Sequence, residues 1–365
     1  MGWAVRVIGL AAAAGITLGQ APGLAPLPPA PAAHSAAVTG IFNWIHSTAD
    51  LDRGYAFYHA VFGLEMTNPQ FGAIPGAPPP NTIRKRSDAI ADPVIGELTN
   101  TGAARFRNLF LRLPNVPFGL ELSEFNDIES RALRPNFWDP GATTLILDVR
   151  DINAVLSAIR NAGAAIVTLS ARPVEIGTTR ERARSILVRD PDGYLIQVIQ
   201  ATPDALSRAG GGEAVVGAAI GVTVSDLDRE RAFYGDILGF DIDGAVDFRS
   251  DKAVLDLIGL RKGRLRLSAA YIPGTRARVE FYEFKDVSGS PVRLRIQDPG
   301  APQLQLRVHE LDPLIQRVKE AGYVFVSVGA KPIQRAFGRF VFALDPNGVL
   351  VEFVEPSQAA VPSPR

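Results

Sequence analysis

One segment of this chain occurs twice. Residues 49–64 read ADLDRGYAFYHAVFGL, and residues 225–240 read SDLDRERAFYGDILGF. The turn sequence DPDG at 190–193 is likewise matched by DPNG at 345–348. Internal repeats on this scale indicate a duplicated architecture. At 365 residues the chain also exceeds the length of one typical domain, so that two domains are expected.

The order of patterns within each copy predicts a strand, a helix and then further strands. Residues 38–48 and 215–224 are apolar and rich in β-branched side chains, which favours strands. Each is followed by Asp-Leu-Asp, and Asp50 and Asp226 are expected to cap the helices that begin there. The sequence therefore predicts an α+β chain of four βαβββ modules. These modules are expected to begin near Val38, Thr143, Val215 and Gln303.

The Asp-Leu-Asp helix entry and the Asp-Pro-Asp-Gly turn before a last strand resemble the vicinal oxygen chelate superfamily. This superfamily includes glyoxalase I, bleomycin-resistance proteins and extradiol dioxygenases. The resemblance covers about residues 38–356. It implies two tandem glyoxalase-like domains with cupped mixed β-sheets, at 38–203 and 213–356, joined by a linker at 204–212. Whether the modules pair in sequence or across the two halves is left open.

The resemblance also implies positions for a site. In the superfamily, the first and last strands of each module supply metal ligands, commonly histidines and carboxylates. The corresponding positions in this chain are Asn43, Glu121, Thr144 and Gln197 in the first domain, and Ala219, Glu280, Gln303 and Glu352 in the second. None of them is a histidine, and neutral amides and hydroxyls are weak ligands for divalent cations. We therefore expect no cofactor, with a hard cation such as Mg²⁺, Mn²⁺ or Ca²⁺ as the less favoured alternative.

These positions, Ala219 excepted, are instead expected to bind a small organic molecule. A pairing of the first module with the fourth would bring Asn43, Glu121, Gln303 and Glu352 into one cup. This set offers better oxygen donors than either sequential pairing. It requires the carboxyl groups of Glu121 and Glu352 to lie near each other.

Histidine and cysteine usage limits the possible chemistry. The chain has four histidines and no cysteine, which excludes disulfides, thiolate metal sites and a cysteine nucleophile. His46 lies three residues after Asn43, so we expect it on the opposite strand face, packed under a helix. No Ser/His/Asp spacing stands out, and no catalytic residue is assigned.

Charge and the chain ends suggest where the protein acts. Lysine plus arginine equals aspartate plus glutamate at 38 each, so a nucleic-acid partner is not expected. Residues 1–21 resemble a secretory signal peptide, residues 22–37 a proline- and alanine-rich spacer, and residues 357–365 a disordered tail. The apolar run is too short to span a bilayer, so no stable membrane insertion is expected after cleavage.

The sequence thus predicts an exported protein, periplasmic or extracellular, that binds a small molecule in a β-sheet cup from which the usual metal ligands are largely lost. Two alternatives stay open. One is a divergent metal-dependent lyase, isomerase or dioxygenase, and the other is a structural or partner-binding protein. The sequence does not indicate an oligomeric state.

Overall fold

The computed structural model of the protein describes residues 37–68, 82–177, 182–244 and 247–357. The predicted signal peptide lies outside these residues, as do the spacer apart from Ala37 and the tail apart from Ser357. Within the described ranges, no helix combines the length and apolarity needed to cross a membrane.

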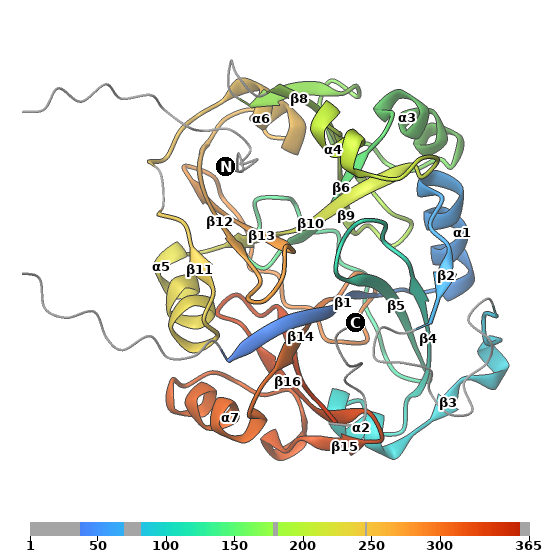
Figure 1. Cartoon of the computed structure of the whole chain (residues 1–365), viewed down its shortest axis with the longest axis vertical. Helices are drawn as coiled ribbons and strands as arrows, with labels where there is room; N and C mark the ends of the chain where they lie inside the picture. Colours follow the sequence, from blue (N-terminus) through green and yellow to red (C-terminus); the bar gives the residue numbers. More distant parts are fainter. Residues whose placement is uncertain (1–36, 69–81, 178–181, 245–246, 358–365) are drawn as a thin grey trace, which may run out of the picture.

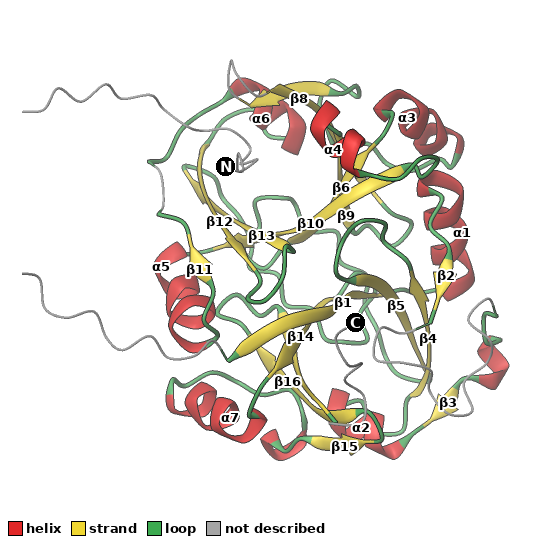
Figure 2. Cartoon of the chain, viewed as in Figure 1, coloured by secondary structure: helices red, strands yellow, loops and turns green. Residues whose placement is uncertain are grey.

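Two curled mixed β-sheets form the centre of the molecule, and we call them sheet A and sheet B (Figures 1 and 2). Sheet A has the strand order β15-β16-β17-β14-β1-β5-β4-β2, and β3 also pairs with β4. Its strands are β1 (Val38–Ser47), β2 (Met66–Thr67), β3 (Ile90–Ala91), β4 (Arg105–Leu111), β5 (Gly119–Asn126), β14 (Pro302–Val308), β15 (Ile333–Arg335), β16 (Gly338–Leu344) and β17 (Leu350–Pro356).

Sheet B has the strand order β11-β12-β13-β10-β6-β9-β8-β7. Its strands are β6 (Thr143–Val149), β7 (Val174–Gly177), β8 (Arg182–Arg189), β9 (Leu195–Gln200), β10 (Val215–Val224), β11 (Asp241–Ile242), β12 (Arg264–Tyr271) and β13 (Arg278–Lys285). The prediction of an α+β fold with cupped sheets built from βαβββ modules is confirmed.

Each sheet takes strands from both halves of the chain. In sheet A, β1 of the first module pairs antiparallel with β14 of the fourth, with Trp44 opposite Leu304. In sheet B, β6 of the second module pairs antiparallel with β10 of the third, with Leu145 opposite Ile220. The pairing across the two halves, which the sequence left open, is therefore the one adopted. The domain boundaries 38–203 and 213–356 describe the repeat in the sequence, and as domain boundaries they remain a prediction. Each sheet combines strands from both ranges.

Buried aspartates tie the two crossing loops together. Asp298 accepts a hydrogen bond from the backbone N–H of Arg131 at 2.9 Å, across the two halves. At the related place in the other loop, Asp139 accepts one from the backbone N–H of Ser290 at 2.9 Å. Both carboxylates are buried, so these bonds hold the connection between β5 and β6 against the connection between β13 and β14.

Helices cover one face of each sheet. The long ones are α1 (Leu51–Phe62), α3 (Ile152–Asn161), α7 (Leu311–Glu320) and the continuous pair α5 (Leu227–Glu230) and η2 (Arg231–Ile237). As predicted, Asp50 caps α1 by accepting from the N–H of Arg53 at 3.0 Å, and Gly63 ends it with a φ of 65°. Apolar side chains of these helices and of alternate strand positions form one continuous core.

Two short helices lie on the other, concave faces of the sheets. Helix α2 (Pro93–Thr99) contacts β15 and β16, and helix α6 (Lys252–Ile258) contacts β7 and β8. Each therefore packs against the module contributed by the other half of the chain. The remaining short elements are α4 (Pro203–Arg208), which takes up part of the predicted linker, η1 (Arg86–Asp88) and η3 (Val328–Ala330).

Helix α2 is held closely against the chain that follows it. A Cβ added to Gly96 would collide with the carbonyl oxygen of Gly102, so α2 would have to shift. We expect Gly96→Ala to lower the free energy of unfolding by about 2 kcal/mol, as overpacking commonly does. Urea denaturation measures this change, and Glu97→Ala, at an exposed position of the same helix, is the control. Equal stability of the two variants would contradict the expectation.

Candidate functional site

We call the concave faces of sheets A and B cup A and cup B. Because the modules pair across the two halves of the chain, the predicted site residues are divided between cup A and cup B. Asn43, Glu121, Gln303 and Glu352 come together in cup A, as the pairing of the first and fourth modules requires. Thr144, Gln197 and Glu280 lie in cup B together with Ala219.

A chain of hydrogen-bonded side chains crosses the floor of cup A. Asn43 Nδ2 donates to Gln305 Oε1 at 2.8 Å, and Gln305 Nε2 donates to Glu352 Oε2 at 2.7 Å. The strand register places these three residues in one row. Gln303 lies in the next row, where its Nε2 donates to Ser47 Oγ at 3.3 Å.

Gln305 is a central residue that the sequence analysis missed. The signal for it was available, because Gln305 follows Gln303 by two residues and a strand places such residues on one face. Asn108 on β4 was also missed, and its Nδ2 donates to Glu121 Oε1 at 2.6 Å. The Oγ of Ser123 donates to the same oxygen at 3.4 Å.

Burial changes the acidity of both glutamates in cup A. It raises the pKa of Glu121 to about 7, against the opposing effect of the hydrogen bonds from Asn108 and Ser123. It raises the pKa of Glu352 to about 8, and the nearby charge of Glu121 adds to this rise. The two carboxyl groups are thus within electrostatic range of each other, and at neutral pH the carboxyl of Glu352 favours its proton.

The donor atoms of cup A do not fit a transition-metal centre. Both polar atoms of the Gln305 amide are used in hydrogen bonds, and amide N–H groups point at Glu121 and Glu352. Within the described ranges, no group of three or more His, Cys, Asp or Glu side chains is arranged to hold a metal ion. Neutral amides with one or two protonated carboxyls would also be weak ligands.

His46 lies on the helix side of sheet A, away from the cup. It is buried under α1, where its Nε2 lies 2.9 Å from Tyr58 Oη and 3.5 Å from Asp190 Oδ2. Its ring stacks on Tyr194 with a centroid separation of 4.7 Å. Burial raises the pKa of Asp190, and the neighbouring His46 opposes this rise. The predicted packing role of His46 is therefore what the structure shows.

Cup A is filled by its own side chains. An apolar cluster covers its floor and includes Phe42, Phe340, Phe342, Leu350 and Val354, with Leu98 of α2 packed against them. Helix α2 is held there by an ion pair between Asp92 and Arg335 and by a hydrogen bond of 2.7 Å from Ser327 Oγ to the carbonyl of Leu98. Asn43 is only 1% exposed.

Cup B has a different floor. Its central strand β10 carries Ala219 and Gly221 on the concave face. The equivalent positions of the repeat in cup A are Asn43 and Ile45. Ala219 lies beside Ile146, which in turn lies beside Gln197. Unlike Asn43, Ala219 is only half-buried. A small side chain in the middle of the sheet therefore leaves this part of the cup accessible.

On one side of this opening, Glu280 anchors a polar group. It accepts a hydrogen bond from the hydroxyl of Tyr282, and its Oε1 lies 2.8 Å from Arg278 Nη2. Burial and the nearby charge of Glu280 raise the pKa of Tyr282, so the phenol keeps its proton. The ring of Tyr282 lies over Gly221, where an added Cβ would meet Tyr282 Cε2 at 3.1 Å.

Several buried polar atoms of cup B lack partners. Gln197 Nε2 donates to Ser185 Oγ at 3.1 Å, but among the described residues nothing donates to the buried Gln197 Oε1. Arg278 Nε and Nη2 likewise make no aligned hydrogen bond to any described residue. By contrast, no buried side-chain oxygen or nitrogen of Asn43, Glu121, Gln305 or Glu352 is without a described partner. Such unsatisfied groups are costly, which makes them candidates for contacts with a ligand.

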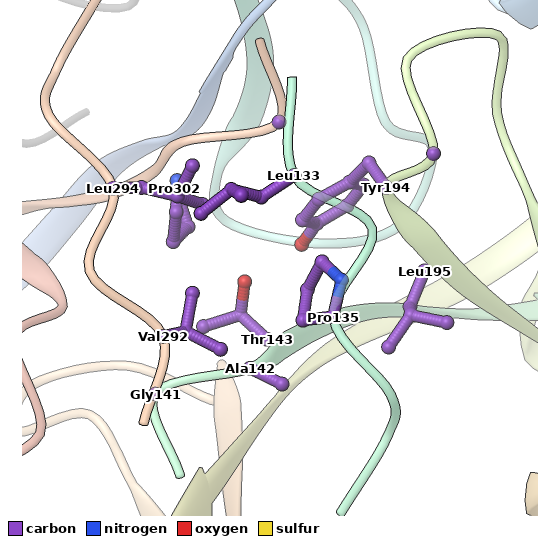
Figure 3. A pocket seen from close by; sticks show the side chains of 12 residues that line it. Leu133, Pro135, Gly141, Ala142, Thr143, Tyr194, Leu195, Val292, Leu294 and Pro302 are labelled. Carbon is purple, nitrogen blue, oxygen red and sulfur yellow. The ribbon is translucent and has the colours of Figure 1, made fainter. Parts of the chain in front are cut away.

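A pocket also lies between the two crossing loops (Figure 3). Its lining is mostly apolar and includes Leu133, Pro135, Val292, Leu294 and Pro302. The hydroxyl of Tyr194, which faces this pocket, already accepts a hydrogen bond from Trp44 Nε1 at 2.8 Å. The pocket therefore offers fewer unsatisfied polar groups than cup B.

Comparisons with known proteins agree with this architecture. Residues 218–353 match the model of the Glyoxalase/Bleomycin resistance protein/Dioxygenase superfamily. The fold resembles glyoxalase I from Zea mays, with a TM-score of 0.52 and 18% identity over 86% of this chain and 92% of that chain. A mutant of the same enzyme gives a TM-score of 0.54 and 17% identity over 86% of this chain and 93% of that chain. At these identities the likeness establishes the fold alone. The sequence matches none of the curated proteins.

Proposed function

We propose that this chain, a tandem member of the glyoxalase/bleomycin resistance/dioxygenase superfamily, binds a small organic molecule in cup B. The observation that carries the proposal is the half-buried Ala219, with the unpartnered Gln197 Oε1 in the same row of the sheet as Ala219. A recognition site needs both accessible space and polar groups that the protein does not itself satisfy. Cup B provides both, whereas the polar floor of cup A is buried and hydrogen-bonded internally.

A buried apolar cluster lies beneath the opening. It includes Leu187, Leu195, Leu267 and Tyr282, and α6 closes one side of it. A ligand of mixed character fits such a lining, with an apolar body and a few polar groups.

Thermal unfolding across a panel of small molecules tests this proposal. A compound that binds only the folded protein stabilises it by about 2.7 kcal/mol at a hundred times its dissociation constant. We expect at least one compound to raise the melting temperature of the wild-type protein and to lose this effect in Ala219→Leu, which fills the opening. Glu352→Gln in cup A is the matched control and should keep the effect. If no compound of the panel has a stabilising effect that is lost in Ala219→Leu, cup B is ruled out as the site.

The polar side chains that line the cups also lead to an expectation about the metal content of the protein. We expect purified protein to contain Fe, Mn, Ni and Zn at well below one ion per chain, because amides and protonated carboxyls bind them weakly. Elemental analysis after gel filtration measures this content. One equivalent of any of these metals, removed by a chelator together with a drop in melting temperature, would favour the alternative of a metal-dependent lyase, isomerase or dioxygenase.

Export of the protein is part of the same proposal. It is supported by the apolar run near the N-terminus and the proline- and alanine-rich segment after it. N-terminal sequencing of the protein recovered outside the cytoplasm would identify the cleavage position. Recovery of the full-length chain in the cytoplasm would contradict export.

A further inference from the structure

We infer that Arg134 and Arg189 form a binding site for a doubly charged oxyanion, such as a phosphate group. Arg134 belongs to the connection between β5 and β6, and Arg189 is the last residue of β8. Both contact the turn residue Gly193. This site is separate from the binding function proposed above and does not depend on it.

The two arginines are held on the same turn. Arg189 Nη1 donates to the carbonyl of Gly193 at 2.6 Å, and its Nη2 donates to the carbonyl of Pro135 at 2.7 Å. The side chain of Arg134 lies against Gly193, because a Cβ added there would be 2.7 Å from Arg134 Cγ. The two bonds of Arg189 therefore hold its guanidinium beside the segment that carries Arg134.

Within the described part of the chain, neither guanidinium is paired with a carboxylate. Both hydrogen bonds of Arg189 go to backbone carbonyls, and Arg134 has no hydrogen bond or ion pair to a described residue. Burial lowers the pKa of Arg189, and the charge of Arg134 lowers it further. Asp139 and Asp190 oppose this change, each with a smaller effect than Arg134. Two like charges held together without a counter-ion favour the binding of an anion.

The carboxylates that act on Arg189 are bonded to other groups. Asp190 accepts from two backbone N–H groups of the turn that it begins, and Asp139 accepts from the backbone N–H of Ser290. Both carboxylates are buried, whereas Arg134 is exposed and Arg189 is partly exposed. An anion from solvent can therefore reach the two arginines without displacing an internal ion pair.

The repeat contains a counterpart of this site with only one arginine. Arg293 takes the place of Arg134 in the other crossing loop, and its Nη1 would lie 3.0 Å from a Cβ added to Gly348. The place of Arg189 is taken by Leu344, the last residue of β16. Two guanidinium groups match the charge and the several oxygens of a phosphate better than one does. The site is therefore expected at the first turn and not at the second.

The arginine pair lies at a distance from the opening of cup B. In the strand order β10-β6-β9-β8, three strand spacings, about 14 Å, separate the backbone of Arg189 from β10, which carries Ala219. Ala219→Leu should therefore leave the binding of an anion at Arg189 unchanged, so that this inference and the proposed function can fail separately.

Calorimetric titration with inorganic phosphate and with methyl phosphate, at one low ionic strength set with chloride, tests the chemical class. We expect phosphate to bind the wild-type protein at least tenfold more tightly than acetate, which carries a single charge. Tighter binding of methyl phosphate would assign the site to phosphate esters, and tighter binding of inorganic phosphate would assign it to the free ion. Absence of phosphate binding, or equal affinity for acetate, would overturn the site.

Variants locate the bound anion. Arg134→Ala removes the exposed guanidinium and should weaken phosphate at least tenfold, whereas Arg293→Ala, the matched control in the other loop, should have no effect. Arg189→Leu copies the second repeat and should also weaken phosphate at least tenfold, with circular dichroism to establish that the variant folds. Equal losses in Arg134→Ala and Arg293→Ala would mean that phosphate binds the surface in general, and would contradict the site.

A charge reversal gives a readout that does not depend on Arg189→Leu folding. Arg134→Glu places a carboxylate beside Arg189, so it should abolish phosphate binding and raise the melting temperature in the absence of phosphate. A lower melting temperature together with unchanged phosphate affinity would show that the two arginines neither repel each other nor share a ligand.

Discussion

Residues 37–203, expressed without the rest of the chain, are expected to self-associate and to lack a cooperative unfolding transition. Strands β1 and β6 of this fragment would lose their antiparallel partners β14 and β10. Both strands are buried in the full chain, and an unpaired edge strand with apolar faces is a template for association. The fragment would also lose the hydrogen bond that links Asp139 to the loop at Ser290.

Gel filtration with light scattering and thermal circular dichroism test this expectation. The fragment 213–357 is the matched control and should behave in the same way, because β10 and β14 are equally exposed without their partners. Co-expression of the two fragments should restore a one-to-one complex with a single melting transition. A monomeric, cooperatively folded 37–203 would show instead that each half can pair its own modules.

The module structure of this fold could be predicted from the sequence, but the pairing of modules could not. The capping aspartates Asp50 and Asp226 and the turn glycine Gly63 act locally, so their roles follow from short stretches of sequence. Each module begins with a similar apolar strand, and the repeat makes β6 and β14 resemble each other as partners for β1. The choice between them depends on long-range packing, such as the crossing loops held by Asp139 and Asp298.

The residues of the candidate site could likewise be predicted only in part from the sequence. The resemblance to the superfamily implied a shared cup for Asn43, Glu121 and Glu352 if the first module pairs with the fourth, and this pairing is the one adopted. Gln305 was missed because the resemblance implies one position per strand, whereas a cup floor is lined by alternate residues of each strand. The accessible floor at Ala219 and the unpartnered oxygen of Gln197 depend on what the neighbouring strands contribute, and no pattern within one strand reveals them.

The buried acid in cup A should make the stability of the protein depend on pH. We expect Glu352→Gln to be more stable than the wild-type protein at pH 9 and to differ little from it near pH 4.5. Burial raises the pKa of Glu352 in the folded protein to about 8, from 4.5 for a glutamate in an unfolded chain. The folded state therefore binds the proton more tightly than the unfolded state does.

The sign of the effect follows from this difference. The stability contributed by the protonated carboxyl is fully present below about pH 4.5, and it is lost as the pH rises through about 8. Each unit of difference corresponds to about 1.4 kcal/mol, so the ionised wild-type side chain should cost roughly 5 kcal/mol at pH 9. Glutamine stays neutral throughout and keeps nearly the same shape, so its variant avoids this loss.

Urea denaturation of both proteins at pH 5, 7 and 9 measures the difference in the free energy of unfolding. Glu310→Gln, on the exposed surface, is the control and should change stability little at any of these pH values. Glu121 titrates in both proteins, so only the difference between them reports on Glu352. A constant difference from pH 5 to pH 9 would mean that Glu352 ionises without cost, and that the floor of cup A is far more open to water than its hydrogen bonds and burial indicate.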